Sequence, residues 1–435
     1  MTRRWIMVGA ALVVAVGLPL AAAGPAAAEP ATTVSYRSNA AAIWYTGQGF
    51  DTCSAPSIAT MQAWNASPYR AIGVYIGGPN RACAQPNLTA SWVSTLAQMS
   101  WRMLPIYLGL QAPCTDAVGK TKITPSQATA QGTASAADAA AAARALGMLS
   151  GSPLYADMEN YLATDTACRT AVLQYLSAWT KEVHRQGFLS GVYANLSSGA
   201  LHLSQFYNST SYARPDVLWM ARWDGSSSLS GWAGISNSQW SVHQRMKQYR
   251  GDHNETYGGV TLSIDNDQVD APVATTTYGY TVTSTTPLSA RKGPGTGYSV
   301  VRTLAPGSTA VLVCQTAGTK VGNTTVWDKL SDGSYVTDLY ISTPSATGYS
   351  PPVPGCRYPY QVTVSSLNRR SAPSASASVV GTLAAGALGW IRCQTSGSKV
   401  GTTSVWDRLA DSSYVTDLYV ATPSKTTYSA PAARC

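Results

Sequence analysis

Two acidic residues stand two positions apart at the end of a short apolar run. The segment 153–159 reads Pro-Leu-Tyr-Ala-Asp-Met-Glu, the pattern of a buried strand whose carboxyl end carries Asp157 and Glu159. Residues i and i+2 of a strand face the same side, roughly 6 to 7 Å apart. Both carboxyl groups would therefore share one small volume, where repulsion and burial raise one pKa and leave the other group ionised.

Such a pair can supply the general acid and the charged partner that glycoside hydrolysis requires. The alternative is a pair of solvated acids that cap the next helix. The segment alone supports both interpretations equally, so the surrounding elements must distinguish them.

Short apolar runs alternate with helical segments between residues 47 and 270. Eight runs have the character of buried strands, at 48–51, 72–77, 103–108, 153–157, 189–194, 217–222, 242–249 and 260–265, and helical patterns lie at 88–99, 135–149 and 169–186. This alternation implies parallel strands, and eight of them in about 225 residues predict an α/β fold of the (β/α)8 barrel type. The sixth and seventh crossovers are short and irregular.

Polar side chains mark the ends of these predicted strands, where such barrels carry their chemistry. The strand-end residues are Asp51 after the first strand, Asp157 and Glu159 after the fourth, Tyr193 and Asn195 after the fifth, Arg222 to Asp224 after the sixth, and Asp265 and Asp267 after the eighth. Closure of the barrel would bring the acids together in one cleft. This favours the catalytic interpretation of the pair.

Eight cysteines, none in a Cys-x-x-Cys pair, favour disulfides in an exported protein over metal or redox chemistry. Cys53 and Cys83 follow the first two predicted strands, and Cys114 and Cys168 follow the third and fourth. We predict these two pairs because each joins neighbouring loops on the face that carries the acids, although the sequence permits other pairings.

The first 28 residues have the pattern of a secretory signal. Two arginines precede an apolar run from Ile6 to about Ala23, and three alanines precede Glu29. No later stretch is long and apolar enough to span a membrane, so we expect an exported, soluble chain without stable membrane insertion after cleavage. The arginine pair leaves general and twin-arginine export both open.

Positive charge is concentrated in the C-terminal part. The chain carries a net +9, but residues 29–271 contain 15 basic and 15 acidic groups, whereas residues 272–435 contain 13 basic and 6 acidic groups. A cationic exported segment suits an anionic surface such as a bacterial wall polymer, and a basic face kept for solubility is the alternative.

The C-terminal part repeats itself at an offset of 79 residues. Val300-Val301 recurs at Val379-Val380, and the block 326–340 recurs at 405–419 with Val-Trp-Asp and Tyr-Val-Thr-Asp-Leu-Tyr in common. Short alternating runs rich in Val, Thr, Tyr and Gly predict a small β-barrel in each copy. Cys314 and Cys356 lie 42 residues apart, as do Cys393 and Cys435, so we expect one disulfide in each copy.

Both copies resemble bacterial SH3-like domains. The resemblance rests on Leu-Asn-Arg-Arg-Ser-Ala-Pro at 367–373, on Val-Val-Gly-Thr-Leu at 379–383, and on the Trp and Tyr-Val that follow. It implies two cell-wall-targeting modules, at 278–356 and 357–435. Four aromatic residues, Trp327, Trp406, Tyr335 and Tyr414, are candidates for wall contact, although the core is the better expectation for them.

The N-terminal domain, which we place at residues 29–271, resembles family 25 glycoside hydrolases over roughly residues 45–271. Those enzymes are lysozymes that cleave peptidoglycan. The resemblance rests on Gly-Phe-Asp at 49–51, Asp-Met-Glu at 157–159, Gly-Val-Tyr-Ala-Asn at 191–195, Gln-Tyr at 248–249 and Ile-Asp-Asn-Asp at 264–267. The opening Gly-Phe-Asp-Thr-Cys-Ser-Ala-Pro-Ser is more similar to a sister family of actinobacterial exported proteins, described only as glycoside-hydrolase-like.

The resemblance implies a role for each acid. Glu159 would be the general acid and then the base, and Asp157 would hold the N-acetyl group or an oxazolinium ion. Asp51 and Asp265 would complete the cluster, and Asp267 would join it or cap the chain's exit. Independently of the resemblance, neighbouring carboxylates raise the pKa of an acid and stabilise an oxocarbenium-like transition state. We expect retention of configuration through substrate assistance, because adjacent carboxylates leave little room for an opposed water.

Five aromatic residues, Tyr75, Tyr107, Tyr193, Trp219 and Trp223, could stack on sugar faces or pack the barrel. His243 and His253 lack a third metal ligand at useful spacing, so we expect neither a metal nor a cofactor.

The sequence therefore predicts a monomeric, secreted, cell-wall-associated glycan hydrolase that does not bind nucleic acid. The competing hypothesis is a non-catalytic wall-binding protein that keeps a glycosidase-like barrel.

Overall fold

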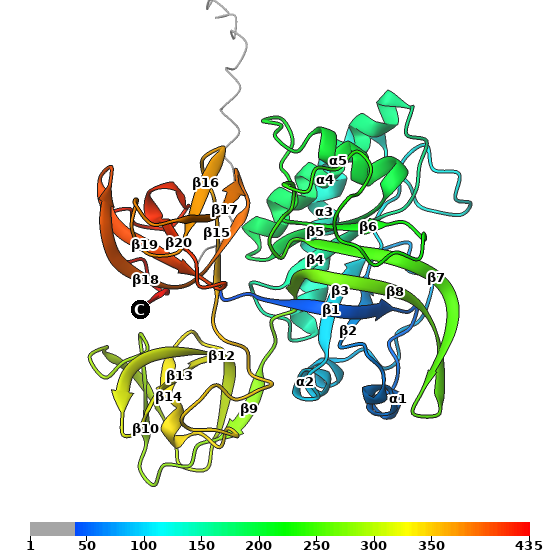
Figure 1. Cartoon of the computed structure of the whole chain (residues 1–435). Coiled ribbons are helices and arrows are strands. Elements are labelled where there is room, and N and C mark those ends of the chain that lie inside the picture. The colour runs from blue at the N-terminus through cyan, green and yellow to red at the C-terminus, as the bar shows by residue number, and fades with distance from the viewer. Residues whose placement is uncertain (1–39) are drawn as a thin grey trace, which may run out of the picture. The chain divides into compact units, whose positions relative to one another are not determined.

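The computed structural model describes residues 40–435, so the predicted signal at 1–28 lies outside the described residues. Eight strands form a closed barrel in chain order (Figure 1). They are β1 (Ile43–Asp51), β2 (Ala71–Gly77), β3 (Arg102–Tyr107), β4 (Pro153–Met158), β5 (Leu189–Asn195), β6 (Val217–Ala221), β7 (Arg245–Tyr257) and β8 (Val260–Val273). The α/β barrel expected from the sequence is present.

Helices cover the outside of the barrel along its first five crossovers. They are α1 (Ile58–Ala63), α2 (Ala90–Gln98), α3 (Ala128–Ala145), α4 (Thr166–Arg185) and α5 (Leu201–Gln205). The three helical patterns predicted from the sequence correspond to α2, α3 and α4. Residues 222–244, which connect β6 to β7, form turns and loops without a helix, in agreement with the irregular crossover expected there.

The direction of the last strand differs from the sequence prediction. β8 runs antiparallel to both of its neighbours, β7 and β1, whereas the strands from β1 to β7 are mutually parallel. The physical reason is the connection, because only Gly258 and Gly259 separate β7 from β8, and a parallel crossover needs a dozen or more residues. Both glycines have positive φ values, 56° and 78°, which suit a tight hairpin turn.

Side chains along each barrel strand alternate between two apolar clusters. Tyr155 of β4 belongs to the cluster inside the barrel, with residues such as Trp219 and Met246. Its neighbours Leu154 and Ala156 belong to the cluster between the strands and the helices. Because this alternation has a period of two, Asp157 shares the inner face with Tyr155.

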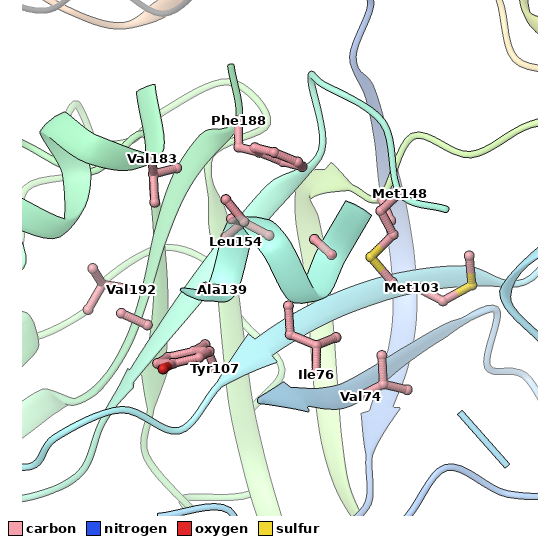
Figure 2. Close-up of a cluster of buried hydrophobic side chains, with 14 of the residues drawn as sticks. Val74, Ile76, Met103, Tyr107, Ala139, Met148, Leu154, Val183, Phe188 and Val192 are labelled. Atoms are coloured by element: carbon pink, nitrogen blue, oxygen red, sulfur yellow. The ribbon is translucent and has the colours of Figure 1, made fainter. Parts of the chain in front are cut away.

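Figure 2 shows part of the outer cluster, to which strand residues such as Val74, Leu154 and Val192 belong together with Ala139 of α3 and Val183 of α4. The alanine-rich helix α3 packs closely on α4, since a Cβ on Gly132 would lie 2.2 Å from the carbonyl oxygen of Tyr175. This layer holds the strands in place and so fixes the positions of their ends.

Each C-terminal repeat consists of one curled β-sheet, and its neighbouring strands are antiparallel except for the short pair β18 and β21. The first sheet has the order β11-β10-β14-β13-β12-β9 and the second the order β15-β18-β19-β20-β16-β17, with β21 paired to β18. The strands of the first are β9 (Tyr278–Thr281), β10 (Leu288–Arg291), β11 (Val300–Leu304), β12 (Thr309–Val321), β13 (Thr324–Leu330) and β14 (Tyr335–Thr337). Those of the second are β15 (Tyr358–Gln361), β16 (Ser366–Arg370), β17 (Val379–Ala384), β18 (Leu388–Val400), β19 (Thr403–Leu409), β20 (Tyr414–Thr416) and β21 (Ala433–Arg434).

A 3-10 turn follows β14 in the first repeat and β20 in the second. These turns are η4 (Asp338–Tyr340) and η5 (Asp417–Tyr419). Trp327, Trp406 and Tyr335 are buried in the cores of the repeats, as expected, whereas Tyr414 is only half-buried.

The four disulfides join the predicted partners: Cys53 to Cys83, Cys114 to Cys168, Cys314 to Cys356, and Cys393 to Cys435. The disulfides of the two repeats close loops of equal length, and each disulfide stabilises the folded state by about 4 kcal/mol through loop-closure entropy. Among residues 40–435, no helix is long and apolar enough to cross a membrane.

Candidate active site

The barrel mouth carries a cluster of acidic side chains from three strands. Asp51 is the last residue of β1, and the antiparallel register of β1 with β8 places Asp265 directly opposite it. The prediction that Asp265 and Asp267 follow the carboxyl end of the eighth strand was wrong, because both lie within β8. Because β8 runs antiparallel to β1, the first half of β8 lies at the barrel mouth. Asp265, in that half, therefore joins the cluster beside Asp51.

Asp157 and Glu159 come from the end of β4, where the buried side chain of Gln111 holds the backbone. Its Nε2 donates to the carbonyl oxygen of Asp157 at 2.8 Å, and its Oε1 accepts from the backbone N–H of Glu159 at 2.9 Å. The side chain of Asp157 is only 3% exposed, and within residues 40–435 its Oδ1 has no hydrogen-bond partner. An unpaired buried carboxylate oxygen is unfavourable unless a proton or a ligand satisfies it.

The acids raise one another's pKa values. Burial and the charge of Asp265 raise the pKa of Asp51 to about 8. Burial, followed by the charges of Glu159 and Asp51, raises the pKa of Asp157 well above its usual range. The cluster therefore holds protons near neutral pH that isolated carboxyl groups would release.

Glu159 is half-buried, and burial raises its pKa as well. Lys120 opposes this shift, and the charge of Asp265 reinforces it. Glu159 is thus an acid that reaches solvent and keeps its proton to a higher pH than a free glutamic acid. Those are the two properties that general-acid catalysis requires.

Gln248 of β7 connects four side chains of the site. Its Nε2 donates to Asp51 Oδ2 at 2.8 Å and to Asp265 Oδ2 at 3.2 Å. Its Oε1 accepts from the hydroxyl of Tyr193 at 2.9 Å and from the indole N–H of Trp223 at 2.8 Å. This buried amide therefore fixes the two aspartates relative to two aromatic side chains.

The candidate aromatic residues fall into two groups. The hydroxyl groups of Tyr75 and Tyr193 lie near the acids, whose charges add to burial in raising the pKa values of both. Trp223 is 57% exposed, so its ring is open to a ligand. Tyr107 lies outside the barrel and donates to Asp138 of α3 at 2.8 Å, and Trp219 is fully buried, so these two are packing residues.

Asp267 lies below the other acids, with no exposed surface. Its Oδ1 accepts from the indole N–H of Trp219 at 3.0 Å, and its Oδ2 has no hydrogen-bond partner among the described residues. Burial and the charge of Asp51 raise its pKa well above the usual range. It can therefore affect Asp51 but does not line the open part of the site.

A cavity of about 250 Å³ adjoins the cluster. Its lining includes Asp51, Tyr75, Arg81 and Asp265, together with the disulfide partners Cys53 and Cys83. The disulfide thus forms part of the rim, as its predicted position between neighbouring loops implies. Asp157 and Glu159 do not line this cavity.

The remaining strand-end candidates lie outside the cluster. Asp224 pairs with Lys247 at 2.7 Å, and the side chain of Asn195 accepts from the backbone N–H of Ser197 at 2.9 Å. His243 contacts Asp270 and His253 contacts Glu255. Among the described side chains, no group of three or more His, Cys, Asp or Glu residues is arranged to hold a metal ion.

Sequence reasoning did not assign a role to three residues of the site. Gln248 was noticed only as part of Gln-Tyr at 248–249, and Gln111 and Lys120 follow the third predicted strand without a distinctive pattern. Gln111 lies shortly after the predicted strand 103–108 and Lys120 lies farther along the same loop, whereas Gln248 lies within the predicted strand 242–249, so no single position marks all three.

Residues 62–269 match the family model described as "Rv2525c-like, glycoside hydrolase-like domain". This stretch contains Asp157, Glu159, Asp265 and Asp267, whereas Asp51 precedes it. No curated protein matches the chain.

Several solved structures are similar to the chain. The Tat-secreted protein Rv2525c of Mycobacterium tuberculosis, in complex with L-tartrate, is 17% identical, with 52% of this chain and 96% of that chain covered and a TM-score of 0.38. An uncharacterised protein of B. stearothermophilus is 19% identical, with 51% and 95% covered and a TM-score of 0.36. A family 25 glycosyl hydrolase from Bacillus anthracis is 13% identical, with 53% and 93% covered and a TM-score of 0.31.

Proposed function

We propose that this Rv2525c-like, glycoside hydrolase-like barrel is the catalytic domain of an exported hydrolase of cell-wall glycans, with peptidoglycan as its substrate. The observation that carries the proposal is the pair Asp157 and Glu159. One of these acids is buried with an unpaired oxygen, and the other is half-buried with a raised pKa. Such a coupled pair can hold one proton between its two carboxyl groups and present that proton, together with the remaining negative charge, to the same sugar.

In the proposed reaction, Glu159 donates its proton to the glycosidic oxygen as the bond to the anomeric carbon breaks. Asp157 accepts the N–H of the substrate's N-acetyl group, whose oxygen closes on the anomeric carbon as an oxazolinium ion. A water molecule then attacks this carbon, and Glu159 takes the proton that the water releases. The configuration is retained, and Glu159 regains its starting state.

Other residues of the cluster would orient these groups. Gln248 holds Asp51 and Asp265 at the border of the site, where the negative charge that remains on the partly protonated cluster stabilises the oxocarbenium-like transition state. Tyr75, Tyr193 and Trp223 would contact the sugars, and Asp267 would act through Asp51. We assign the sugar contact chiefly to Trp223 because its ring is exposed.

The C-terminal part would serve as the targeting part of the enzyme. We propose that residues 278–356 and 357–435 are two SH3-like domains that bind the wall, because they carry the chain's excess positive charge. Four disulfides suit a protein that works outside the cytoplasm. In this proposal the protein is secreted and associated with the cell wall, and acts as a monomer.

One observation favours the non-catalytic alternative. The cavity beside the cluster is lined by Asp51 and Asp265 but not by Asp157 or Glu159. A ligand could therefore bind there without contact to the proposed acid, as in a glycan-binding protein.

The two functions can be separated by substitution of Glu159. Purified peptidoglycan is incubated with the wild-type protein, with Glu159→Gln and with Glu182→Gln, and reducing ends and product masses are measured. Glu182 is a matched control because it lies on α4, where it pairs with Arg185 outside the barrel. We expect Glu159→Gln to lower the rate by about 100- to 10,000-fold, and Glu182→Gln to leave it unchanged.

Binding to sedimented cell wall is measured with the same proteins. Equal binding of wild type and Glu159→Gln, with hydrolysis lost only in the variant, supports the enzyme. If the wild-type protein binds the wall but releases no sugar from it, the non-catalytic alternative replaces the proposal.

A further inference from the structure

A second kind of acidic cluster lies inside each C-terminal repeat. In the first repeat, the side chain of Gln315 on β12 donates from Nε2 to Asp328 Oδ1 at 2.9 Å and to Asp338 Oδ1 at 3.1 Å. The hydroxyl of Thr343 also donates to Asp338 Oδ1, at 2.7 Å. The Oε1 of Gln315 accepts from the backbone N–H of Ser350 at 2.7 Å. One amide thus joins two strands, the turn η4 and the segment 343–350.

The second repeat contains the same four contacts. Gln394 donates to Asp407 at 2.7 Å and to Asp417 at 3.1 Å, Thr422 donates to Asp417 at 2.6 Å, and Ser429 N–H donates to Gln394 at 2.6 Å. Every residue of this set lies 79 positions after its counterpart. The arrangement is therefore a property of the repeat and not of one local environment.

In each pair, both aspartates are fully buried, with 0% exposure. Their second oxygens, the Oδ2 atoms, have no donor group within reach among the described residues, and the two carboxyl groups of a pair face each other. Two ionised carboxylates in contact without water or a cation are strongly unfavourable. A single proton shared by the two carboxyl groups removes one charge and supplies a hydrogen bond between them.

The groups that face the two pairs differ between the repeats. Tyr280 of β9 faces the first pair, and its pKa is raised by burial, by Tyr278 and by both aspartates. Lys425 faces the second pair and favours its ionised form. The matching position in the first repeat is Ala346.

We propose that each C-terminal repeat is closed by one proton shared between two buried aspartates, Asp328 with Asp338 and Asp407 with Asp417. Loss of this proton opens the contact that ties the segment 343–350, or 422–429, to the sheet. The repeat is thereby a pH-sensitive element that is closed in acid and loosens as the pH rises.

The direction follows from proton linkage. Asp328 and Asp407 have pKa values well above 3.8 in the closed repeat, because of burial and then of their partner's charge, whereas an aspartate that opening exposes to water titrates normally. The closed state therefore binds more protons than the open state between these two pKa values. The equilibrium constant for closure is greatest below the ordinary pKa of aspartate. It falls by up to about tenfold per pH unit as the pH rises, until the closed pair ionises.

Hydrogen exchange measured by mass spectrometry on the full oxidised chain tests this proposal. Protection of the amides in 343–350 and 422–429 is recorded between pH 5 and pH 9 and corrected for the intrinsic exchange rate. We expect protection in both segments to fall by several-fold to about tenfold per pH unit in part of this range. Protection that does not depend on pH in either segment overturns the proposal without any substitution.

Two variants locate the effect in the pair. Asp328→Asn supplies a permanent N–H donor in place of the proton, so the slope should fall below about twofold per pH unit in 343–350 and remain in 422–429. Asp332→Asn is the matched control, because Asp332 is an exposed residue of the same repeat that pairs with Arg302. A slope in Asp328→Asn equal to that of the wild type would assign the pH dependence to another group and reject the shared proton.

Discussion

The barrel mouth and the C-terminal repeats contain the same chemical unit, in which one buried glutamine amide donates to two aspartates. Gln248 joins Asp51 to Asp265, and Gln315 joins Asp328 to Asp338. In both places burial raises the pKa values of the acids. The hydrogen-bond pattern alone would not distinguish a site of chemistry from a structural cluster.

The two units differ in access and in what the glutamine oxygen accepts. Gln248 accepts from Tyr193 and from the exposed Trp223, and its aspartates line a cavity of about 250 Å³. Gln315 accepts from a backbone N–H, and its aspartates have no exposed surface. A raised pKa therefore indicates a functional site only where a substrate can reach the group, and otherwise indicates a proton that belongs to the fold.

The largest effect expected to distinguish the two regions comes from the same substitution made in both. Asp157→Asn should lower the rate of glycan hydrolysis by about 100- to 1000-fold, because it removes one of the two carboxyl groups that share the proton and the remaining negative charge. Asp328→Asn should leave this rate unchanged. Rates on soluble glycan fragments and the melting temperature of each variant are the measurements, and equal losses of activity in both variants would contradict the distinction.

The next effect concerns the amide in the repeat. Gln315→Leu removes the donor of two buried aspartates and the acceptor of Ser350, so we expect the free energy of unfolding of the first repeat to fall by about 3 kcal/mol. Hydrogen exchange resolves the two repeats in one chain, and the unchanged second repeat is the control. Equal protection in both repeats would show that the amide contributes little to stability.

A smaller effect is expected at the barrel mouth from Lys120→Ala. Lys120 lowers the pKa of Glu159, so its removal raises that pKa. Because a general acid must be protonated, activity that is lost as the pH rises should persist to a higher pH, by up to about one unit. The pH–rate profile tests this, with Lys181→Ala on α4 as control. A shift toward lower pH would contradict the assignment of Glu159 as the acid.

The smallest expected effect is the difference between the two repeats in the pH at which they lose protection from hydrogen exchange. Lys425 favours the ionised form of the second pair, so the second repeat should lose protection at a lower pH than the first. Lys425→Ala should move its transition upward by less than about one unit, toward that of the first repeat, and Ala346→Lys should do the reverse. Exchange profiles with identical midpoints in all three proteins would exclude a role for Lys425.

Local pattern was sufficient for much of this protein. The strand that carries Asp157 near its end, the tandem repeat and one disulfide in each repeat follow from spacing, because strand periodicity and loop proximity are set by nearby residues. The two disulfides of the barrel were favoured by the positions of their cysteines after neighbouring strands, although the sequence permitted other pairings. The same local reasoning was wrong about β8. It assumed a parallel strand and overlooked that Gly258 and Gly259 allow only a hairpin.

Which distant side chains come into contact was decided only by the tertiary structure. Asp51 and Gln248 are 197 residues apart, and their contact exists because the barrel closes with one particular register. Asp328 and Asp338 are close in sequence, yet their burial depends on the whole sheet around them. Sequence determines which groups can ionise, whereas packing determines how near they lie and how much water remains, and these two quantities set their pKa values.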